Sequence, residues 1–562
     1  MTDGSTGQTQ GIGVSPGAAV GPVVQVRPPV RAPEGEPAPA DPTAEHERVK
    51  AVFESVAVTL EERAATADDT AQQILTATAL IARDKGLMKA IGKHLLTGKG
   101  PATATTAAVE EYAAQFEALG GYFAERVTDL KDVRNRAVAR ILGKEDPGVP
   151  PFSEPSVIVA HDLAPAETAT LDVAKVRGIV TEAGGRTSHT AILAAQMGIP
   201  AVVRLAGATA IPAGTIVAVD GDSGLVTIDP SEDYQNQLVG RREKRAAALA
   251  GSSGPGLTAD GHPVPLLANI GGVEDAVAAG GLDLEGVGLF RTEFVFLSRD
   301  TAPTLAEQTE IYSKVFEPFA GRRVVVRTLD SGADKPLAFA DLGPEENPAL
   351  GKRGLRLSAH RPDLLDTQLE ALSAAAKATS ADVKVMAPMV ATAEEAAWFA
   401  RRVRENGLPS VGVMIEVPGA AISSRHVMAE VDFGSLGTND LAQYTMAADR
   451  MEGELSDLLD PWQPAVLQVI GLACDGARLA GKPMGVCGEA GGDPLLALVL
   501  TGLGVGSLSM APSKVAMVRF ALARHTLAEC QGMAQAALES RTAQDARAAV
   551  LALADADLAE LV

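Results

Sequence analysis

The sequence predicts a multidomain α/β protein whose C-terminal half forms a (β/α)8 barrel. At about 150 residues per domain, its 562 residues correspond to three or four domains. After the loose segment GSSGPG at 251–256, apolar runs alternate with helical patterns over about 300 residues, which is the size and repeat of such a barrel. A doubly wound open sheet is the alternative. The eight apolar runs are PLLANI, GVGLFR, VVVRTL, VKVMAP, VGVMIEV, FGSLGT, MGVCG and SLSM.

The N-terminal half combines a β-rich segment with a helical one. Residues 11–30 show short strand patterns separated by Gly and Pro, whereas apolar residues recur at helical spacing between 44 and 143. Strand patterns then return in SVIVA, GIVTEA, PAVVRL, TIVAVD and LVTID. The simplest topology is a helical domain inserted into an α/β domain. We expect the α/β domain at 1–36 and 146–230, the helical domain at 37–145, a linker helix and hinge at 231–256, and the barrel at 257–562.

The composition excludes several classes of protein. The chain carries 49 Lys and Arg against 71 Asp and Glu, and its formal net charge of −22 repels nucleic acid and anionic membranes. Three cysteines provide no disulfide framework, and the N-terminus has no signal-peptide pattern. The longest uncharged run, 494–513, is broken by Gly, Ser and Pro, so we interpret it as core strand and loops. We expect a soluble, cytoplasmic protein that neither binds nucleic acid nor inserts into a membrane.

Polar residues follow the predicted barrel strands at their C-terminal ends, the face on which barrel enzymes build their active sites. Arg291, Arg327 and Arg450 lie at or near strand ends, and Arg353 and Arg356 lie in the loop after NPALG. Converging guanidinium groups suit a phosphate or a carboxylate. The alternative is that each is a surface arginine with an acidic partner. The strand-end residues are Asn269, Arg291, Arg327, Glu416, Asn439, Asp440 and Cys487.

Two carboxylates and a thiol are also predicted at the C-terminal face of the barrel. Glu416 and Asp440 end neighbouring predicted strands, and paired carboxylates beside a phosphate site commonly hold Mg²⁺. Helix capping is the alternative for each. Cys487 follows a strand and precedes a glycine, so its thiol should face the barrel mouth as a nucleophile or a general acid. The alternative is inert packing, which is how we interpret Cys474 and Cys530.

A second candidate site lies in the segment GGRTSHTAILAAQMGIPAVV. The strand GIVTEA runs into a Gly-Gly turn, Thr187 and Ser188 are candidate helix caps, and His189 falls in the first turn of a helix. Backbone N–H donors and the helix dipole there stabilise added negative charge and favour a neutral imidazole. His189 is therefore a candidate phosphoryl carrier, with a structural histidine as the alternative.

These motifs together resemble enzyme I of the bacterial phosphoenolpyruvate-dependent sugar phosphotransferase system. The resemblance covers nearly the whole chain, and several of its segments are long. They are GIGVSPGAAVG, YFAERVTDLKDV, GGRTSHTAILA, GVGLFRTEFVFL, VVVRTLDSGADKP, EENPALGKRGLR, VMAPMV, GVMIEVPGA, DFGSLGTNDLAQYTMAADR, GKPMGVCGEAGGD and GLGVGSLSM.

The resemblance implies a swivelling phosphohistidine α/β domain, an inserted helical domain that docks the phosphocarrier protein HPr, and a TIM barrel that binds phosphoenolpyruvate and forms a homodimer. It implies that His189 carries the phosphoryl group and that Cys487 protonates the enolate to give pyruvate. It also implies Mg²⁺ held by Glu416 and Asp440. The implied phosphoenolpyruvate site consists of Arg291, Arg327, Arg353, Asn439, Asp440 and Arg450.

The chain departs from the usual pattern of the family in two places. LDSGADKP stands where LDIGGDKP is more usual, which places Ser331 and Ala333 near the predicted site. Neither change removes a charged group, so we expect tuning of the site and no loss of activity. In the helical insert, QILTATALIARDKGL lacks the His and acidic residues that many relatives carry.

Two other functions compete with this one. A pyruvate phosphate dikinase or phosphoenolpyruvate synthase shares the phosphohistidine and barrel domains, but it needs a nucleotide-binding domain, and the sequence contains no P-loop pattern. A non-catalytic regulator that binds phosphoenolpyruvate should have lost His189, Cys487 or a metal carboxylate. All of these residues are present.

Overall fold

The computed structural model divides the chain into two compact units, Met1–Arg242 and Glu243–Val562. Each unit has its own cores of buried apolar residues. The described residues are 7–15, 17–65, 69–119, 127–150, 152–163, 171, 174–185, 189–296, 299, 301–331, 337–340, 343, 345–450 and 452–562.

A mixed sheet organises the first unit. Among the described residues its strand order is β1-β8-β7-β3-β4-β5-β6-β2, with parallel pairing from β3 through β6. The apolar run SVIVA forms β4, which is buried at every position, as expected of a central strand covered on both faces. The strands are β1 (Gly7–Gln10), β2 (Ile12–Ser15), β3 (Ala18–Gln25), β4 (Ser156–Ala160), β5 (Val176–Thr181), β6 (Ala201–Val203), β7 (Ile216–Asp220) and β8 (Leu225–Ile228).

The helical segment is an insertion between two neighbouring strands of this sheet. β3 precedes the helices and β4 follows them, yet the two strands pair in parallel. Just beyond the ends of this pairing, the backbone groups of Arg27 and Gly148 exchange hydrogen bonds of 3.1 and 2.9 Å. The chain therefore enters and leaves the insertion at adjacent points.

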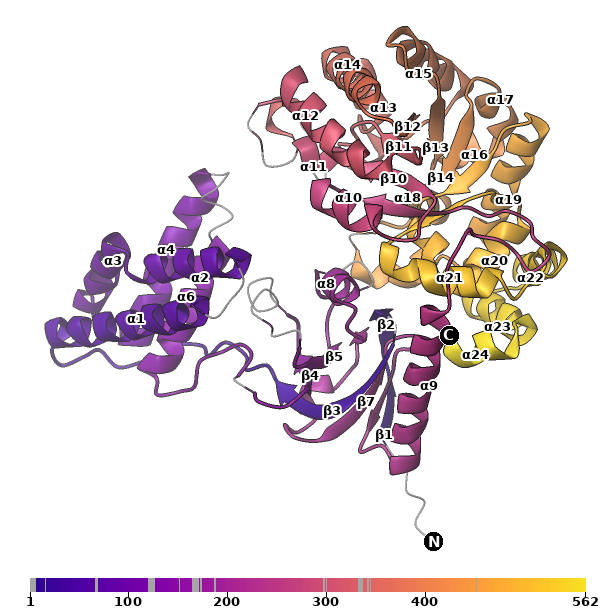
Figure 1. Ribbon diagram of the computed structural model, residues 1–562. Coiled ribbons are helices and arrows are strands. Elements are labelled where there is room, and N and C mark those ends of the chain that lie inside the picture. Colours follow the sequence, from indigo (N-terminus) through magenta and orange to yellow (C-terminus); the bar gives the residue numbers. More distant parts are fainter. Residues whose placement is uncertain are drawn as a thin grey trace. The chain divides into compact units, whose positions relative to one another are not determined.

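The inserted helices pack around a core of their own (Figure 1). Helix α1 begins where Asp41 accepts hydrogen bonds from the backbone N–H groups of Thr43 and Ala44 at 2.9 and 3.1 Å. Pro42 at the first helical position suits this start, since its missing N–H is not needed there. The helices are α1 (Pro42–Ala64), α2 (Asp69–Ala82), α3 (Lys85–Leu96), α4 (Pro101–Leu119) and α6 (Val127–Ile141).

One continuous helix, α9 (Glu232–Ala250), contains the boundary between the two units. Before the boundary, Arg241 Nη2 lies 2.7 Å from Asp220 Oδ2 of the first unit. After the helix, Arg519 Nη1 donates to the carbonyl of Ser252 at 3.2 Å. The segment expected to be a loose linker after α9 is thus fastened to the barrel.

The second unit is a closed barrel of parallel strands, so the open-sheet alternative is wrong (Figure 1). All eight apolar runs identified in the sequence form its strands, in the order in which they occur. The strands are β9 (Leu266–Ile270), β10 (Gly286–Arg291), β11 (Arg323–Arg327), β12 (Asp382–Ala387), β13 (Val411–Ile415), β14 (Phe433–Leu436), β15 (Met484–Val486) and β16 (Leu508–Met510).

Helices surround the barrel and bury its outer face in a single large core. Leu289, Val325, Met386 and Met414, from four consecutive strands, form a separate small cluster with Cys487. Side chains alternate between the two faces of a strand, so this cluster identifies the barrel interior. The helices are α10 (Val273–Gly280), α11 (Glu293–Phe296), α12 (Leu305–Phe316), α13 (Leu355–His360), α14 (Pro362–Ala378), α15 (Ala393–Glu405), α16 (Pro418–Ile422), α17 (Ser424–Ala429), α18 (Thr438–Met446), α19 (Pro464–Leu479), α20 (Pro494–Gly502), α21 (Val515–Leu522), α22 (Leu527–Glu539), α23 (Ala543–Leu553) and α24 (Ala556–Leu561).

The uncharged run at 494–513 is half helix, where the sequence analysis expected strand and loops. Asp493 accepts hydrogen bonds from the N–H groups of Leu495 and Leu496 and so starts α20, which is buried on nearly all sides. A helix that is apolar all round gives no amphipathic period, so the sequence pattern does not distinguish it from a buried strand. In the described part of the chain, no helix has both the length and the apolarity needed to cross a bilayer.

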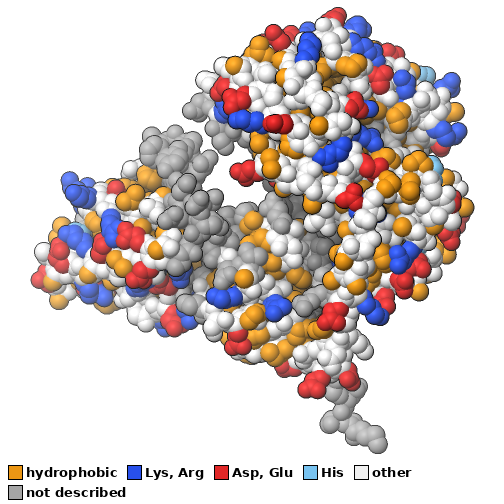
Figure 2. Space-filling view, viewed as in Figure 1, with side chains coloured by type: hydrophobic (Ala, Val, Ile, Leu, Met, Phe, Trp, Pro, Cys, Tyr) orange, Lys and Arg blue, Asp and Glu red, His pale blue; other side chains and the backbone are white. Residues whose placement is uncertain are grey.

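Acidic side chains are spread among basic ones on the face of each unit that is visible in Figure 2. Figure 2 shows Asp and Glu side chains interspersed with Lys and Arg on both units. Many form pairs, such as Arg83 with Glu54 at 2.6 Å on the helical segment and Lys314 with Glu310 at 2.7 Å on the barrel. A net charge of −22 is therefore compatible with local clusters of positively charged side chains.

Candidate active site at the barrel mouth

Polar side chains from six of the barrel strand ends and two of the loops beyond them line one cavity. The cavity lies on the face to which the C-terminal ends of the strands point, as the sequence predicted. Of the predicted arginines of the barrel, Arg356 does not line this cavity. Its guanidinium instead donates to the carbonyls of Leu350 and Gly351 at 3.0 and 3.1 Å. The predicted residues that line the cavity are Asn269, Arg291, Arg327, Arg353, Glu416, Asn439, Asp440, Arg450 and Cys487.

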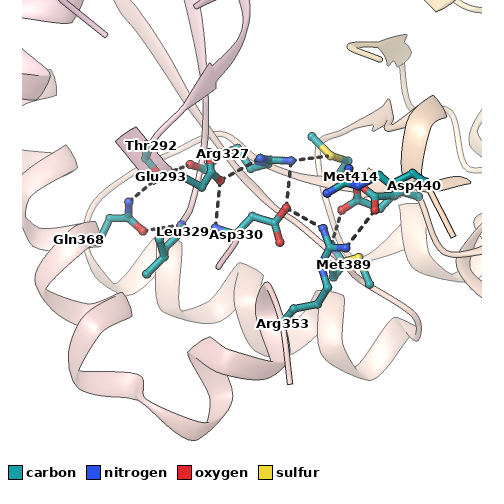
Figure 3. A network of polar contacts seen from close by, with 12 residues as sticks. Thr292, Glu293, Arg327, Leu329, Asp330, Arg353, Gln368, Met389, Met414 and Asp440 are labelled. Atoms are coloured by element: carbon teal, nitrogen blue, oxygen red, sulfur yellow. Dashed lines mark hydrogen bonds and ion pairs between the residues drawn. The ribbon is translucent and has the colours of Figure 1, made fainter. Parts of the chain in front are cut away.

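Two buried acids that the sequence analysis missed orient two of these arginines. Glu293 Oε1 lies 2.9 Å from Arg327 Nη2. Asp330 Oδ2 lies 3.2 Å from both Arg327 Nη1 and Arg353 Nη2, and Arg353 Nη1 lies 3.0 Å from Asp440 Oδ1 (Figure 3). The sequence carried a signal for them, because each follows the end of its strand within three positions.

Acidic and guanidinium groups alternate in this network, and their mutual attraction keeps Arg327 and Asp330 charged. Burial lowers the pKa of Arg327, but Glu293 and Asp330 outweigh burial and raise that pKa above its ordinary value. Burial raises the pKa of Asp330, but Arg327 and Arg353 outweigh it and lower that pKa. Neighbouring acids likewise raise the pKa of Arg353, so Arg327 and Arg353 both stay cationic. Their enclosure strengthens their electrostatic attraction for an anionic ligand.

Several buried polar atoms of the network lack a partner. Nε of Arg327, Nε of Arg353 and Oδ1 of Asp330 are enclosed and have no hydrogen-bond partner among the described residues. Buried polar atoms in native proteins are nearly always paired. Their presence at the edge of a cavity is typical of a site that completes its hydrogen bonds with a ligand or water.

Glu416 and Asp440 bring two carboxylates to the cavity. Glu416 is 1% exposed, and its Oε1 accepts a 2.6 Å hydrogen bond from the backbone N–H of Met389. Met389 has a φ of 57°, a left-handed conformation that is rare for a side chain of this kind and that aims its N–H at the carboxylate. Burial and the charge of Asp440 raise the pKa of Glu416 to about 8.

This carboxylate pair fits a hard divalent cation. Burial first, and then the neighbouring carboxylate of Asp440, disfavour the charged form of Glu416, and a bound cation would favour it. The described residues contain no cluster of three or more His, Cys, Asp or Glu that could enclose a metal by itself. Glu416 and Asp440 would thus supply two oxygen ligands, with water and a phosphorylated ligand completing the shell, as is usual for Mg²⁺.

Cys487 lies directly after β15, lines the cavity and is 3% exposed. Burial raises the pKa of its thiol to about 11, although a hydrogen bond with Ser435 acts in the opposite direction. The thiol therefore keeps its proton at neutral pH. Of the two roles that the sequence left open, a general acid fits this state and a thiolate nucleophile does not.

Two asparagines make hydrogen bonds to the segment that carries the thiol. Asn269 Nδ2 donates to the carbonyl of Cys487 at 3.0 Å, and its Oδ1 accepts from Ser509 Oγ at 2.6 Å. Asn439 Oδ1 accepts from the backbone N–H of Glu489 at 3.3 Å. These bonds hold the loop that carries Cys487 against β9 and α18.

Three family models cover most of the chain: the N-terminal domain of PEP-utilising enzymes at 10–126, their mobile domain at 152–224, and their PEP-binding domain at 247–527. A phosphoenolpyruvate-protein phosphotransferase from Streptomyces coelicolor is 50% identical over 547 residues, which cover 97% of this chain and 98% of that protein. The chain belongs to the phosphoenolpyruvate-protein phosphotransferase family.

More distant members extend the same comparison. The phosphoenolpyruvate-protein phosphotransferase of Haloferax volcanii is 40% identical over 95% of this chain and 97% of its own length. That of Bacillus subtilis is 39% identical over 77% of this chain and 79% of its own length. The chain is thus an enzyme of this family, and its fold, with an inserted helical segment and a C-terminal barrel, agrees with the fold class predicted from the sequence.

The predicted phosphohistidine lies partly outside the described residues. Helix α8 (His189–Met197) begins at His189, as the sequence predicted, but the side chain of His189 and residues 186–188 are outside the described set. Of the two altered residues in LDSGADKP, Ser331 is buried next to Asp330 in the sequence, and Ala333 is outside the described set. The role of His189 in this phosphotransferase stays a prediction.

Proposed function

We propose that this chain transfers a phosphoryl group from phosphoenolpyruvate to its own His189 and then to a histidine of the phosphocarrier protein HPr, releasing pyruvate. This is the first step of the sugar phosphotransferase system. The proposal is carried by one observation: buried cationic arginines and a buried protonated thiol line the same barrel mouth. The arginines suit a phosphorylated carboxylate, and the thiol suits an enolate that must be protonated.

Arginines at the mouth would bind the substrate. Arg291, Arg327, Arg353 and Arg450 surround the cavity and would grip the phosphate and carboxylate oxygens, with Asn439 as an additional donor. Because Glu293 and Asp330 hold two of the guanidinium groups in place, little reorganisation is needed when substrate enters. Phosphoryl transfer needs mainly such positioning and charge stabilisation.

The chemistry would then proceed in two steps. A ring nitrogen of His189 attacks phosphorus, and the bond from phosphorus to the enol oxygen breaks, so that the enolate leaves with the electron pair. Cys487 donates its thiol proton to the methylene carbon of the enolate, which gives pyruvate, and the thiolate regains a proton from water. Glu416 and Asp440 would hold Mg²⁺, which when bound neutralises negative charge on the transferring phosphoryl group.

The partner and the assembly are further parts of the proposal. The helical domain at 37–145 would dock HPr, while the barrel would form a homodimer and the linker at 231–256 would let the phosphohistidine domain swivel between its two reaction partners. The acidic charge of the chain should attract a basic face of HPr. Transfer to HPr should accordingly slow as ionic strength rises, and a salt-independent rate would contradict this part.

Labelled phosphoenolpyruvate tests the central claim. With Mg²⁺ and no ATP, the purified chain should acquire acid-labile label, and His189→Ala should abolish it. His262→Ala provides a matched control, because His262 is exposed and does not line the cavity. Equal labelling of the parent and His189→Ala would reject the assignment, and a requirement for ATP would favour the dikinase alternative.

A further inference from the structure

A buried amide in the helical layer around the barrel connects to the active site from outside. Gln368 lies on α14, is 1% exposed and does not line the cavity. Its Oε1 accepts a hydrogen bond from the backbone N–H of Leu329 at 3.0 Å, and its Nε2 donates to Thr292 Oγ1 at 3.1 Å (Figure 3). One side chain thus ties the loop after β10 to the loop after β11.

The two residues that Gln368 holds are the immediate neighbours of the two acids in the arginine network. Thr292 precedes Glu293, and Leu329 precedes Asp330. Thr292 Oγ1 also donates to the carbonyl of Arg327 at 2.8 Å. A shift of either loop would therefore move the carboxylates that orient the guanidinium groups of the site.

The Gln368 amide also makes a hydrogen bond to a third element. Its Nε2 makes a second hydrogen bond, to the hydroxyl of Tyr312 on α12 at 3.1 Å. Tyr312 donates to Gln308 Oε1 at 3.1 Å, and Gln308 Nε2 donates to the carbonyl of Pro303 at 2.9 Å. An amide has one acceptor and two donors, and here all three are used, so a flipped amide would lose every bond.

We infer that Gln368 is a positioning residue for phosphoenolpyruvate binding, acting through Thr292–Glu293 and Leu329–Asp330 on Arg327 and Arg353. The inference rests on the function proposed for the barrel mouth. Gln368 touches neither substrate nor metal. Its contribution is to lock the loops that carry the acidic partners of the substrate-binding arginines.

The expected kinetic signature separates positioning from stability. Misplaced arginines weaken the binding of substrate and transition state alike, so the KM for phosphoenolpyruvate should rise while kcat changes little. A purely structural defect lowers the fraction of folded enzyme, which reduces the apparent kcat and leaves KM unchanged. Gln368→Met removes the three hydrogen bonds at similar volume, and we expect its KM to rise about tenfold.

Tyr312→Phe is the matched control. It removes a buried hydroxyl from the same cluster, but Gln368 keeps its bonds to Leu329 and Thr292. The two tryptophans of the chain, Trp398 and Trp462, both lie in the barrel, so their fluorescence reports on its unfolding alone. Both variants should unfold at a lower denaturant concentration than the parent. Only Gln368→Met should raise the KM for phosphoenolpyruvate more than twofold.

The outcomes are decisive in either direction. An unchanged KM in Gln368→Met, or an equal rise in Tyr312→Phe, would overturn the inference. If the methionine variant does not fold, Gln368→Glu keeps the acceptor for Leu329 but loses both donors, and an unchanged KM in that variant overturns it equally. A parent that phosphoenolpyruvate does not phosphorylate would instead reject the proposed function.

Discussion

Arg327 Nη2 lies 2.9 Å from Oε1 of Glu293, and the same oxygen accepts a hydrogen bond from the backbone N–H of Asp330 at 3.1 Å. Glu293 therefore holds both a substrate-facing arginine and the loop that carries the next acid. It lies two residues after the end of β10 and is 4% exposed. Substitution of Glu293 should therefore affect both the stability of the barrel and the binding of substrate.

Glu293→Gln should destabilise the barrel, because the buried guanidinium of Arg327 loses one of its two negative partners. We expect a loss of about 3 kcal/mol in the free energy of unfolding, as for other broken buried ion pairs. Denaturant titration followed by tryptophan fluorescence measures it. Glu310→Gln breaks an exposed pair with Lys314 and should leave the unfolding midpoint unchanged. A midpoint for Glu293→Gln equal to that of the parent would contradict the expectation.

Cys487→Ala should separate phosphoryl transfer from pyruvate formation. Labelling of the protein by phosphoenolpyruvate should continue, while the protonation of the enzyme-bound enolate slows by about a hundredfold or more, since a positioned acid is lost. Single-turnover assays of protein label and of pyruvate measure the two steps. Cys530→Ala is the control, because Cys530 is buried outside the cavity. An unchanged rate of pyruvate formation would remove Cys487 from the mechanism.

The raised pKa of Cys487 predicts how its reactivity depends on pH. With a pKa of about 11, the thiol stays protonated through the neutral range and loses its proton only as the pH approaches 11. Alkylation by iodoacetamide should therefore be slow at pH 7 and increase about tenfold per pH unit from pH 7 to about pH 10, because only the thiolate reacts. Mass spectrometry of the modified peptide, with Cys487→Ala as the blank, measures this. A labelling rate that levels off between pH 7 and 9 would show an ordinary or lowered pKa.

Glu416→Gln should raise the Mg²⁺ requirement of autophosphorylation. The substitution replaces a charged oxygen ligand by a neutral one, so the Mg²⁺ concentration for half-maximal labelling should increase about tenfold. Glu489→Gln tests specificity, since Glu489 is an exposed carboxylate at the same cavity and should change this concentration less than twofold. Equal effects of the two substitutions would indicate a general charge effect at the mouth.

The barrel and most of its mouth could be predicted from the sequence because both depend on local patterns. Each strand is a short apolar run, and parallel strands of a barrel bring their C-terminal ends to one face. Arg291, Glu416 and Cys487 needed no further information, since position at a strand end determines the face on which each one lies. Arg353 and Arg450 come from loops, where the strand pattern indicates the neighbourhood of the mouth, and the family resemblance adds their role in binding the substrate.

The contacts between layers could not be predicted in this way. Glu293 and Asp330 follow strand ends, but their pairing with Arg327 depends on side-chain directions that no periodicity encodes. Gln368 lies on an outer helix, where its sequence neighbours give no sign of a link to the mouth. The backbone of Met389 has a positive φ, which its residue type disfavours, so tertiary packing must impose it.

The hydrogen bonds between Arg27 and Gly148 have a consequence for how such enzymes diversify. Because the inserted helices leave and rejoin the sheet at neighbouring backbone positions, they form a cassette whose removal demands no rearrangement of β3 or β4. If the inserted helices dock HPr as proposed, exchanging this cassette between relatives should redirect the enzyme to another acceptor protein without altering its phosphoryl donor. On that proposal, the choice of partner and the phosphoryl chemistry can change independently of each other.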